Sequence, residues 1–151
     1  MKRTILTLAA LCSLVGGCAS AHHDTPAGFA AFDDNKAYDF YASDGEGVVL
    51  AVRTEKNRPH GDLSYWTSAL DVQLREAGYR PHNVADVTSA DGHAGKQLRY
   101  VVEDDGRELV FWVSVFVTDR HVVLVEAGGD VAFFEPKEAQ IEAAIATLRV
   151  G

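Results

Sequence analysis

Leu109–Thr118 reads LVFWVSVFVT, and it decides the fold because it is apolar on both sides of an extended chain. Successive side chains of a β-strand point to opposite faces of the sheet. One face of this strand therefore carries Leu109, Phe111, Val113, Val115 and Val117, and the other carries Val110, Trp112 and Phe116. A strand that is apolar on both faces must be covered on both. The sequence thus predicts a central strand with a packed layer on either side.

Strand patterns before and after this stretch predict an antiparallel sheet. The other candidate strands have alternating or continuous apolar residues and lie at Lys36–Ala42, Gly47–Thr54, Val84–Thr88, Lys96–Glu103 and His121–Ala127. Asp44-Gly45 lies between the first two, and such a pair accepts the positive φ angles of a tight hairpin turn. Because short turns between successive strands imply antiparallel pairing, we expect about six strands in one antiparallel sheet.

Two amphipathic segments are available to cover the faces of this sheet. The first begins at Asp62, a good N-cap, and ends before Gly78, which suits the left-handed position after a helix. Its apolar stripe consists of Leu63, Trp66, Leu70, Leu74 and Ala77. The second begins at Pro136, and its inward stripe consists of Ile141, Ala144, Ile145 and Leu148. The predicted fold class is α+β: a three-layer α/β/α sandwich with one helix layer on each face of the antiparallel sheet.

The first eighteen residues, MKRTILTLAALCSLVGGC, predict export. Lys2 and Arg3 precede the apolar run Ile5–Val15, which is shorter than the roughly 20 apolar residues that a membrane-spanning helix needs. Such a run ending in small residues is typical of a cleaved signal peptide. Cys18 directly follows Gly16-Gly17, so the segment resembles the lipobox of bacterial lipoproteins. The alternative is an ordinary signal peptide in which Cys18 is incidental.

The lipobox resemblance implies a domain organisation and a location. It divides the chain into a signal peptide at residues 1–17, a flexible tether at 18–28 and a single domain at 29–151. Cys18 would become the first residue and carry acyl chains on its thiol and its amine. Ala19 is not the Asp that marks inner-membrane retention, so the implied location is the outer membrane, facing the periplasm.

Charge and cysteine content narrow the classes of partner and of chemistry. The sequence has 14 Lys and Arg against 22 Asp and Glu residues, a formal charge of −8. Removal of the signal peptide with Lys2 and Arg3 would leave 12 basic against 22 acidic residues, a formal charge of −10. Such an acidic domain argues against nucleic-acid binding and against membrane adhesion by charge alone, so membrane attachment would depend on acyl chains. Cys12 and Cys18 are the only cysteines, so the processed domain would have no disulfide and no thiol nucleophile.

The order of elements resembles the PsbP fold, which also includes the yeast Mog protein that binds the GTPase Ran and the bacterial DcrB- and LpqN-type lipoproteins. The resemblance covers residues 29–150 and rests on DGEGVVLAVRT (44–54), DLSYWTSALDVQLREAGY (62–79) and FVTDRHVVLVEAGGD (116–130). It implies a role in protein binding or chaperone-like support rather than a particular reaction.

No motif in the sequence predicts a metal or cofactor site. His22-His23-Asp24 offers three side chains that can bind metals, but structural zinc needs four ligands held by the fold, so we interpret this run as a polar linker. Gly92–Lys96 lacks both the first glycine and the final Ser or Thr of a phosphate-binding loop. We therefore predict no metal and no cofactor.

No motif predicts a catalytic site either. Ser64, His60 and Asp62 could form a triad only by tertiary accident, and a role in starting the helix is the better interpretation of Asp62 and Ser64. The apolar segment Val131–Phe134 has two readings, burial over the sheet or an exposed docking patch.

The sequence therefore favours a noncatalytic, lipid-anchored envelope lipoprotein that binds or supports an unidentified envelope protein. Three alternatives stay open: a periplasmic carrier of small ligands, an immunity or inhibitor protein that intercepts a toxin, and a hydrolase whose activity would depend on His60 or His93.

Overall fold

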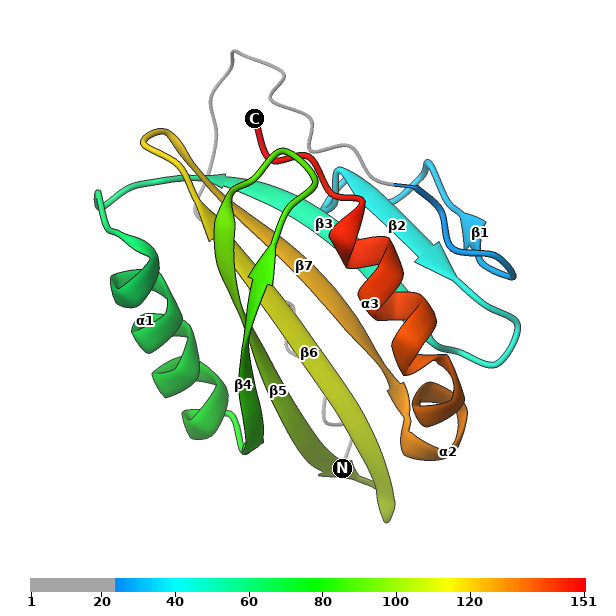
Figure 1. The fold of residues 1–151 in the computed structure, drawn as a ribbon. Helices are drawn as coiled ribbons and strands as arrows, with labels where there is room; N and C mark the ends of the chain where they lie inside the picture. Colours follow the sequence, from blue (N-terminus) through cyan, green and yellow to red (C-terminus); the bar gives the residue numbers. More distant parts are fainter. Residues whose placement is uncertain (1–23) are drawn as a thin grey trace.

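The computed structural model describes residues 24–151, which form one sheet with helices packed on it (Figure 1). The signal peptide predicted at 1–17 and the predicted acylation site Cys18 lie outside the described residues. The strands are β1 (Ala30–Ala31), β2 (Phe40–Ser43), β3 (Val49–Lys56), β4 (Arg80–Thr88), β5 (Ala94–Asp104), β6 (Arg107–Val117) and β7 (His121–Asp130). The helices are α1 (Leu63–Glu76), α2 (Val131–Phe134), the 3-10 turn η1 (Glu135–Lys137) and α3 (Glu138–Ala146).

The sheet has seven strands in the order β1-β2-β3-β7-β6-β5-β4, and every neighbouring pair is antiparallel. The antiparallel prediction is confirmed, but the predicted number of about six strands is wrong. The additional strand is the two-residue β1, which pairs with Ala42 and Ser43 of β2. A two-residue strand is too short to show the alternation of apolar and polar residues from which strands are predicted.

The predicted strand limits differ from the structure most at the start of two strands. β2 begins at Phe40 rather than Lys36, and β4 begins at Arg80 rather than Val84. Pro81 lies inside β4, where the pairing register with β5 shifts between Pro81 and Asn83. Proline has no N–H to donate and is tolerated at an edge strand or a bulge, and β4 is both the edge strand and irregular at this point.

The prediction of a two-faced central strand is confirmed by β6. Its Val113 and Val115 belong to one buried cluster, with Leu98, Tyr100, Val122 and Leu124. Its Trp112 and Phe116 belong to a second cluster, with Val52, Val123, Val125 and other residues of β3 and β7. Leu63, Trp66, Leu70 and Leu74 of α1 pack against the first cluster. Phe134 of α2 and Ile141, Ala144 and Ile145 of α3 belong to the second.

The turn and cap predictions are confirmed in most details. The Asp62 carboxylate accepts a hydrogen bond from the backbone N–H of Tyr65 at 2.8 Å, and Gly78 has a φ of +94° after α1. The β2–β3 turn differs from the prediction, because its positive φ lies at Gly47 (+86°) and not at Asp44 or Gly45. Asp44 instead accepts hydrogen bonds from the N–H groups of Glu46 and Val48.

A buried polar chain crosses the second cluster. Gln97 donates from Nε2 to Ser114 Oγ at 3.2 Å, and Arg99 donates from Nε to Gln97 Oε1 at 2.7 Å. The Arg99 guanidinium lies 3.9 Å from the centroid of the Trp112 ring and reaches Glu142 of α3. Each polar group therefore has a partner, which offsets the cost of burying Ser114 inside an apolar strand.

Candidate functional site

The first-cluster face of the sheet is only partly covered by a helix. α1 lies over β4, β5 and β6. On the same face, β3 and β7 carry Arg53, which is paired with the cluster residue Leu124, and Glu126, two positions beyond Leu124. Tyr38 and Tyr41 approach from the β2 side and Tyr79 from the end of α1. We call Tyr38, Tyr41, Tyr79, Arg53 and Glu126 the tyrosine surface.

An ion pair lies at the centre of the tyrosine surface. Arg53 Nη2 is 2.9 Å from Glu126 Oε1, and the two side chains are only 14% and 17% exposed. Arg53 Nη1 also lies 3.8 Å from Glu55 Oε1. Arg53 Nε is buried and has no hydrogen-bond partner among residues 24–151. The pair therefore fixes a cation and an anion side by side and leaves one guanidinium donor unused.

Aromatic rings surround this pair. The ring centroids of Tyr38 and Tyr41 are 5.6 Å apart, and those of Tyr79 and Phe111 are 5.3 Å apart. Tyr79 also meets Tyr100 edge to face at 6.3 Å. The rings hold each other in defined positions, so the surface is preorganised rather than a set of free side chains.

The pKa values of the two outer tyrosines are raised. Burial raises the pKa of Tyr38 most, the negative charge of Glu126 raises it further, and Arg53 partly opposes this. Burial also raises the pKa of Tyr79 most, followed by the charges of Glu126 and Asp104. Both phenols therefore keep their protons at neutral pH and remain hydrogen-bond donors.

This combination of groups suits recognition of a macromolecule. Tyrosine and arginine are enriched at protein interfaces, because each combines a large contact area with hydrogen bonding. The surface presents neutral phenols and one ion pair, and it holds no activated nucleophile.

The residues that the sequence singled out as candidates do not come together. Cys18, His22 and His23 lie outside the described residues, whereas the Asp24 N–H donates to Thr147 Oγ1 at 3.0 Å. His60 and His82 are exposed on a loop and on β4. Within residues 24–151, no group of three or more His, Cys, Asp or Glu side chains could hold a metal ion.

The capping interpretation of Asp62 is confirmed, since its carboxylate is used by the first turn of α1. Ser64 is exposed in that same turn. His93 lies elsewhere, in the β4–β5 turn, with Nδ1 3.4 Å from Asp91 Oδ1.

Val131–Phe134 is partly buried and partly exposed, so each of its two interpretations, burial or an exposed docking patch, has to be considered residue by residue. Phe134 is fully buried, and its ring meets Trp112 edge to face with centroids 4.9 Å apart. Val131 packs against the same cluster, whereas Phe133 is 42% exposed. Burial over the sheet is therefore confirmed for Phe134, and no contiguous docking patch forms in this segment.

The sequence interpretation missed the tyrosine surface. A signal was present, because Arg53 and Glu126 are each a charged residue within an otherwise apolar strand, GVVLAVRT and HVVLVEA. A charge within such a strand indicates a paired or functional group. What could not be read was that these two residues, 73 positions apart, face each other.

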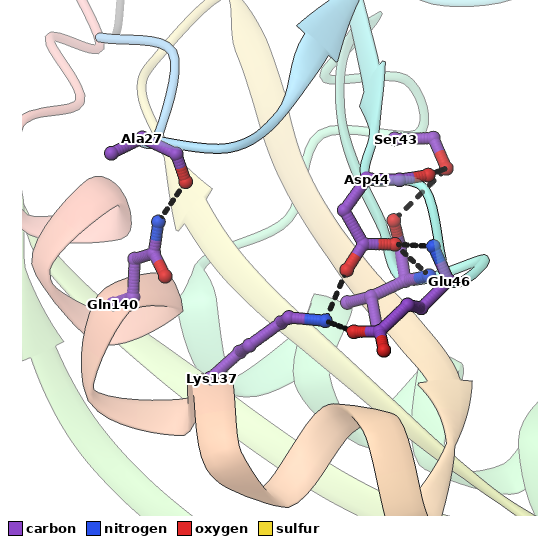
Figure 2. A network of polar contacts seen from close by, with 7 residues as sticks. Ala27, Ser43, Asp44, Glu46, Lys137 and Gln140 are labelled. Atoms are coloured by element: carbon purple, nitrogen blue, oxygen red, sulfur yellow. Dashed lines mark hydrogen bonds and ion pairs between the residues drawn. The ribbon is translucent and has the colours of Figure 1, made fainter.

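A second polar network ties the β2–β3 turn to the helical segment (Figure 2). Lys137 Nζ donates to Asp44 and to Glu46, and nearby Gln140 donates to the carbonyl of Ala27. Burial by itself would raise the pKa of Asp44, but hydrogen bonds from Lys137 and from the N–H groups of Glu46 and Val48 outweigh it and hold the pKa below its usual value. The same carboxylates raise the pKa of Lys137.

This network predicts an acid-sensitive contribution to stability. Asp44→Asn should lower the free energy of unfolding at pH 7 by about 2 kcal/mol, because hydrogen bonds to a charged group contribute roughly 1.5–3 kcal/mol. A carboxylate with a lowered folded-state pKa stabilises the fold above its ordinary pKa, 3.8 here, and loses that effect as the pH falls through the folded value. Urea denaturation should therefore show the difference at pH 7 and a narrowing below pH 3.8.

Glu46→Gln is the matched control, because that side chain is 55% exposed and a surface ion pair contributes at most about 1 kcal/mol. A difference between Asp44→Asn and the parent that persisted unchanged in acid would contradict the assignment of the effect to the Asp44 charge.

The sequence matches no protein-family model and no curated relative. Solved structures match the fold. LpqN from Mycobacterium tuberculosis, described as involved in cell envelope biogenesis, has a TM-score of 0.69 at 10% identity, covering 85% of this chain and 82% of that chain. Cyanobacterial PsbP from Synechocystis has a TM-score of 0.57 at 16% identity, covering 95% and 99%. The fold is PsbP/LpqN-like.

A protein of unknown function from Pseudomonas aeruginosa has the same PsbP/LpqN-like fold, with a TM-score of 0.58 at 15% identity over 80% of each chain. The predicted resemblance to this group is thus confirmed for the fold. Within residues 24–151, no helix of the PsbP/LpqN-like domain has the length and apolar character to cross a bilayer.

Proposed function

We propose that this chain is a noncatalytic, lipid-anchored protein of the bacterial envelope, attached to the outer membrane through Cys18, that docks an envelope protein through the tyrosine surface. The observation that carries the docking role is the ion pair Arg53–Glu126 with Tyr38, Tyr41 and Tyr79 around it. The likeness to LpqN, described as involved in cell envelope biogenesis, supports a role in the envelope.

The scaffold for this role is the predicted three-layer α/β/α arrangement. The packing of the two helices supports this arrangement. α1 packs against the cluster that contains Val113 and Val115 of β6, whereas α3 belongs to the cluster that contains Trp112 and Phe116. In this arrangement α1 leaves the β3–β7 part of its own face to the tyrosine surface. A partner strand or helix resting there would bury the exposed parts of the phenols and of the Arg53–Glu126 pair.

Site-specific photocrosslinking in intact cells tests the docking role. A benzophenone amino acid in place of Tyr38 or Tyr79 should give a discrete crosslinked band that mass spectrometry assigns to one envelope protein. Arg53→Ala should reduce the band at least about tenfold, because truncation of a central interface residue costs 2 kcal/mol or more.

Tyr65 is the matched control position. It is a 47% exposed tyrosine on α1, and its ring meets Trp66 away from the tyrosine surface. Crosslinks of equal strength from position 65, or no protein crosslink from position 38 or 79, would contradict docking at this surface. Copurification of a small molecule that Arg53→Ala releases would favour the carrier alternative instead.

Intact-mass measurement of the protein extracted from membranes tests the anchor. We expect a chain that begins at Cys18 and carries acyl chains, since several chains are needed for stable attachment. A full-length chain without lipid would contradict the anchor.

A further inference from the structure

One end of the sheet gathers three loops. Residues 57–62 link β3 to α1, residues 89–93 link β4 to β5, and residues 118–120 link β6 to β7. Register places them together, since Gly95 is opposite Phe116 and Lys56 is opposite His121. Figure 1 shows these loops at the top of the view with the C-terminus among them. We call these three loops, together with the C-terminal residues 147–151, the loop end.

The chain enters the domain at the loop end. Asp24, the first described residue, donates its N–H to Thr147 Oγ1 at 3.0 Å. The next residue, Leu148, accepts a 2.7 Å hydrogen bond from Ala90 in the β4–β5 turn. Val150 then donates to the Asp91 carboxylate at 3.0 Å. The tether therefore joins the domain beside residues 89–93.

Tether length limits the distance between this end and the anchor. Cys18 is six residues before Asp24. A fully extended chain spans at most 3.3–3.6 Å per residue, so six residues span about 20 Å. The sheet is longer, because the eleven residues of β6 extend about 35 Å. With Cys18 acylated, the loop end is the end that reaches the membrane surface.

Unpaired arginines lie at the loop end. Arg58, Arg120 and Arg149 are exposed, and none of them forms an ion pair with another described residue. The Asn57 N–H donates to the Arg120 carbonyl at 2.8 Å, which brings the first two arginines together. Two carboxylates at this end, Asp62 and Asp91, accept hydrogen bonds from backbone N–H groups, while Asp119 is exposed.

The opposite end of the sheet has a net negative charge. The β5–β6 hairpin presents Glu103, Asp104, Asp105 and Glu108, against Arg107 and the Arg80 that pairs with Glu108 at 3.0 Å. A Lys or Arg near an anionic lipid surface contributes about 1 kcal/mol of attraction. The three exposed arginines can therefore contact lipid phosphates, although Asp62, Asp91 and Asp119 balance their formal charge at this end.

We propose that the loop end faces an anionic phospholipid surface, with Arg58, Arg120 and Arg149 against lipid phosphates. This inference rests on the acylation of Cys18 in the proposed function. In this orientation the β5–β6 hairpin and Tyr79, at the far end of α1, point away from the membrane.

Energy transfer to the membrane surface tests the orientation. Acylated protein would be reconstituted into vesicles of phosphatidylglycerol and phosphatidylcholine that contain a headgroup acceptor dye. Ala90→Cys at the loop end and Ala77→Cys at the far end of α1 are exposed alanines that place one donor dye each. Acylation blocks Cys18, so each variant has one free thiol. Transfer from position 90 should exceed transfer from position 77 at least about twofold, given the length of the sheet.

The arginines are tested by combining Arg58→Gln, Arg120→Gln and Arg149→Gln. In this variant, the ratio of energy transfer from position 90 to that from position 77 should fall toward one. The same fall is expected for the parent protein in vesicles of phosphatidylcholine alone. Lys36→Gln with Arg107→Gln removes exposed cations elsewhere and should leave the ratio unchanged.

Equal transfer from positions 90 and 77 in the acylated protein would overturn the orientation alone. A ratio insensitive to the three arginine substitutions would overturn the phosphate contacts. If energy transfer from position 90 exceeded that from position 77 only after addition of envelope extract, the loop end would contact a protein rather than lipid. Absence of acyl chains in the same preparation, seen by intact mass, would overturn the anchor and the orientation together.

Discussion

Replacing Phe134 with alanine should lower the free energy of unfolding by about 3–5 kcal/mol, the usual cost of truncating a buried phenylalanine. Phe134 is fully buried and meets Trp112 edge to face with ring centroids 4.9 Å apart. It joins the α2 segment to the buried cluster beneath α3, so its loss leaves a cavity that the sheet cannot close. Chemical denaturation of the purified protein measures the change.

Phe133→Ala is the control, since the neighbouring side chain is 42% exposed. We expect that change to stay within about 0.5 kcal/mol, as for most surface substitutions. Similar losses for the two variants would contradict the division of Val131–Phe134 into a buried and an exposed half.

Replacing Asn57 with alanine should lower the free energy of unfolding by about 3 kcal/mol, because each buried group left unpaired costs 1–3 kcal/mol. The Asn57 side chain is buried and connects three segments. Its Nδ2 donates to the carbonyls of Gly61 and Thr118 at 2.9 Å, and its Oδ1 accepts from the Gly61 N–H and from Trp66 Nε1. The loss should appear in thermal and chemical denaturation alike.

Asn83→Ala is the matched control. Asn83 lies on the edge strand β4, is exposed, and makes one hydrogen bond, from the neighbouring Val84 N–H. A loss below about 0.5 kcal/mol is expected there. A comparably small loss at Asn57 would mean that water replaces its hydrogen bonds and that the loop 57–61 is not held by this side chain.

The parts of the fold that could be predicted depend on local pattern. Leu109–Thr118 has apolar residues at every position of both faces except Ser114 and Thr118, so its two-sided burial could be read directly. The cap at Asp62 and the φ of Gly78 follow from residues within a few positions of each other. The predicted strand limits were wrong where pairing with a neighbouring strand outweighs the local sequence, since β4 continues through Pro81. β1 was not predicted because it has only two residues.

The candidate site could not be predicted for a related reason. Tyr38, Tyr79 and Glu126 come from three separate segments, and they share a surface only because β3 lies next to β7. Hairpin patterns identify neighbours that are consecutive in the chain, and the β3–β7 pair is not consecutive. The acylation of Cys18 stays a prediction from the N-terminal pattern.

The pairing of β3 with β7 has a consequence for folding during synthesis. All eight residues of β3 pair with residues that come some 70 positions later, as with Arg53 and Glu126, which are 73 positions apart. Pairings between distant segments form slowly, because loop closure must precede the contacts. A nascent chain that ends before His121 can pair β3 with β2 but has no partner for the other edge of β3. The unpaired β3 edge would therefore be open to pairing with other chains until β7 has been synthesised.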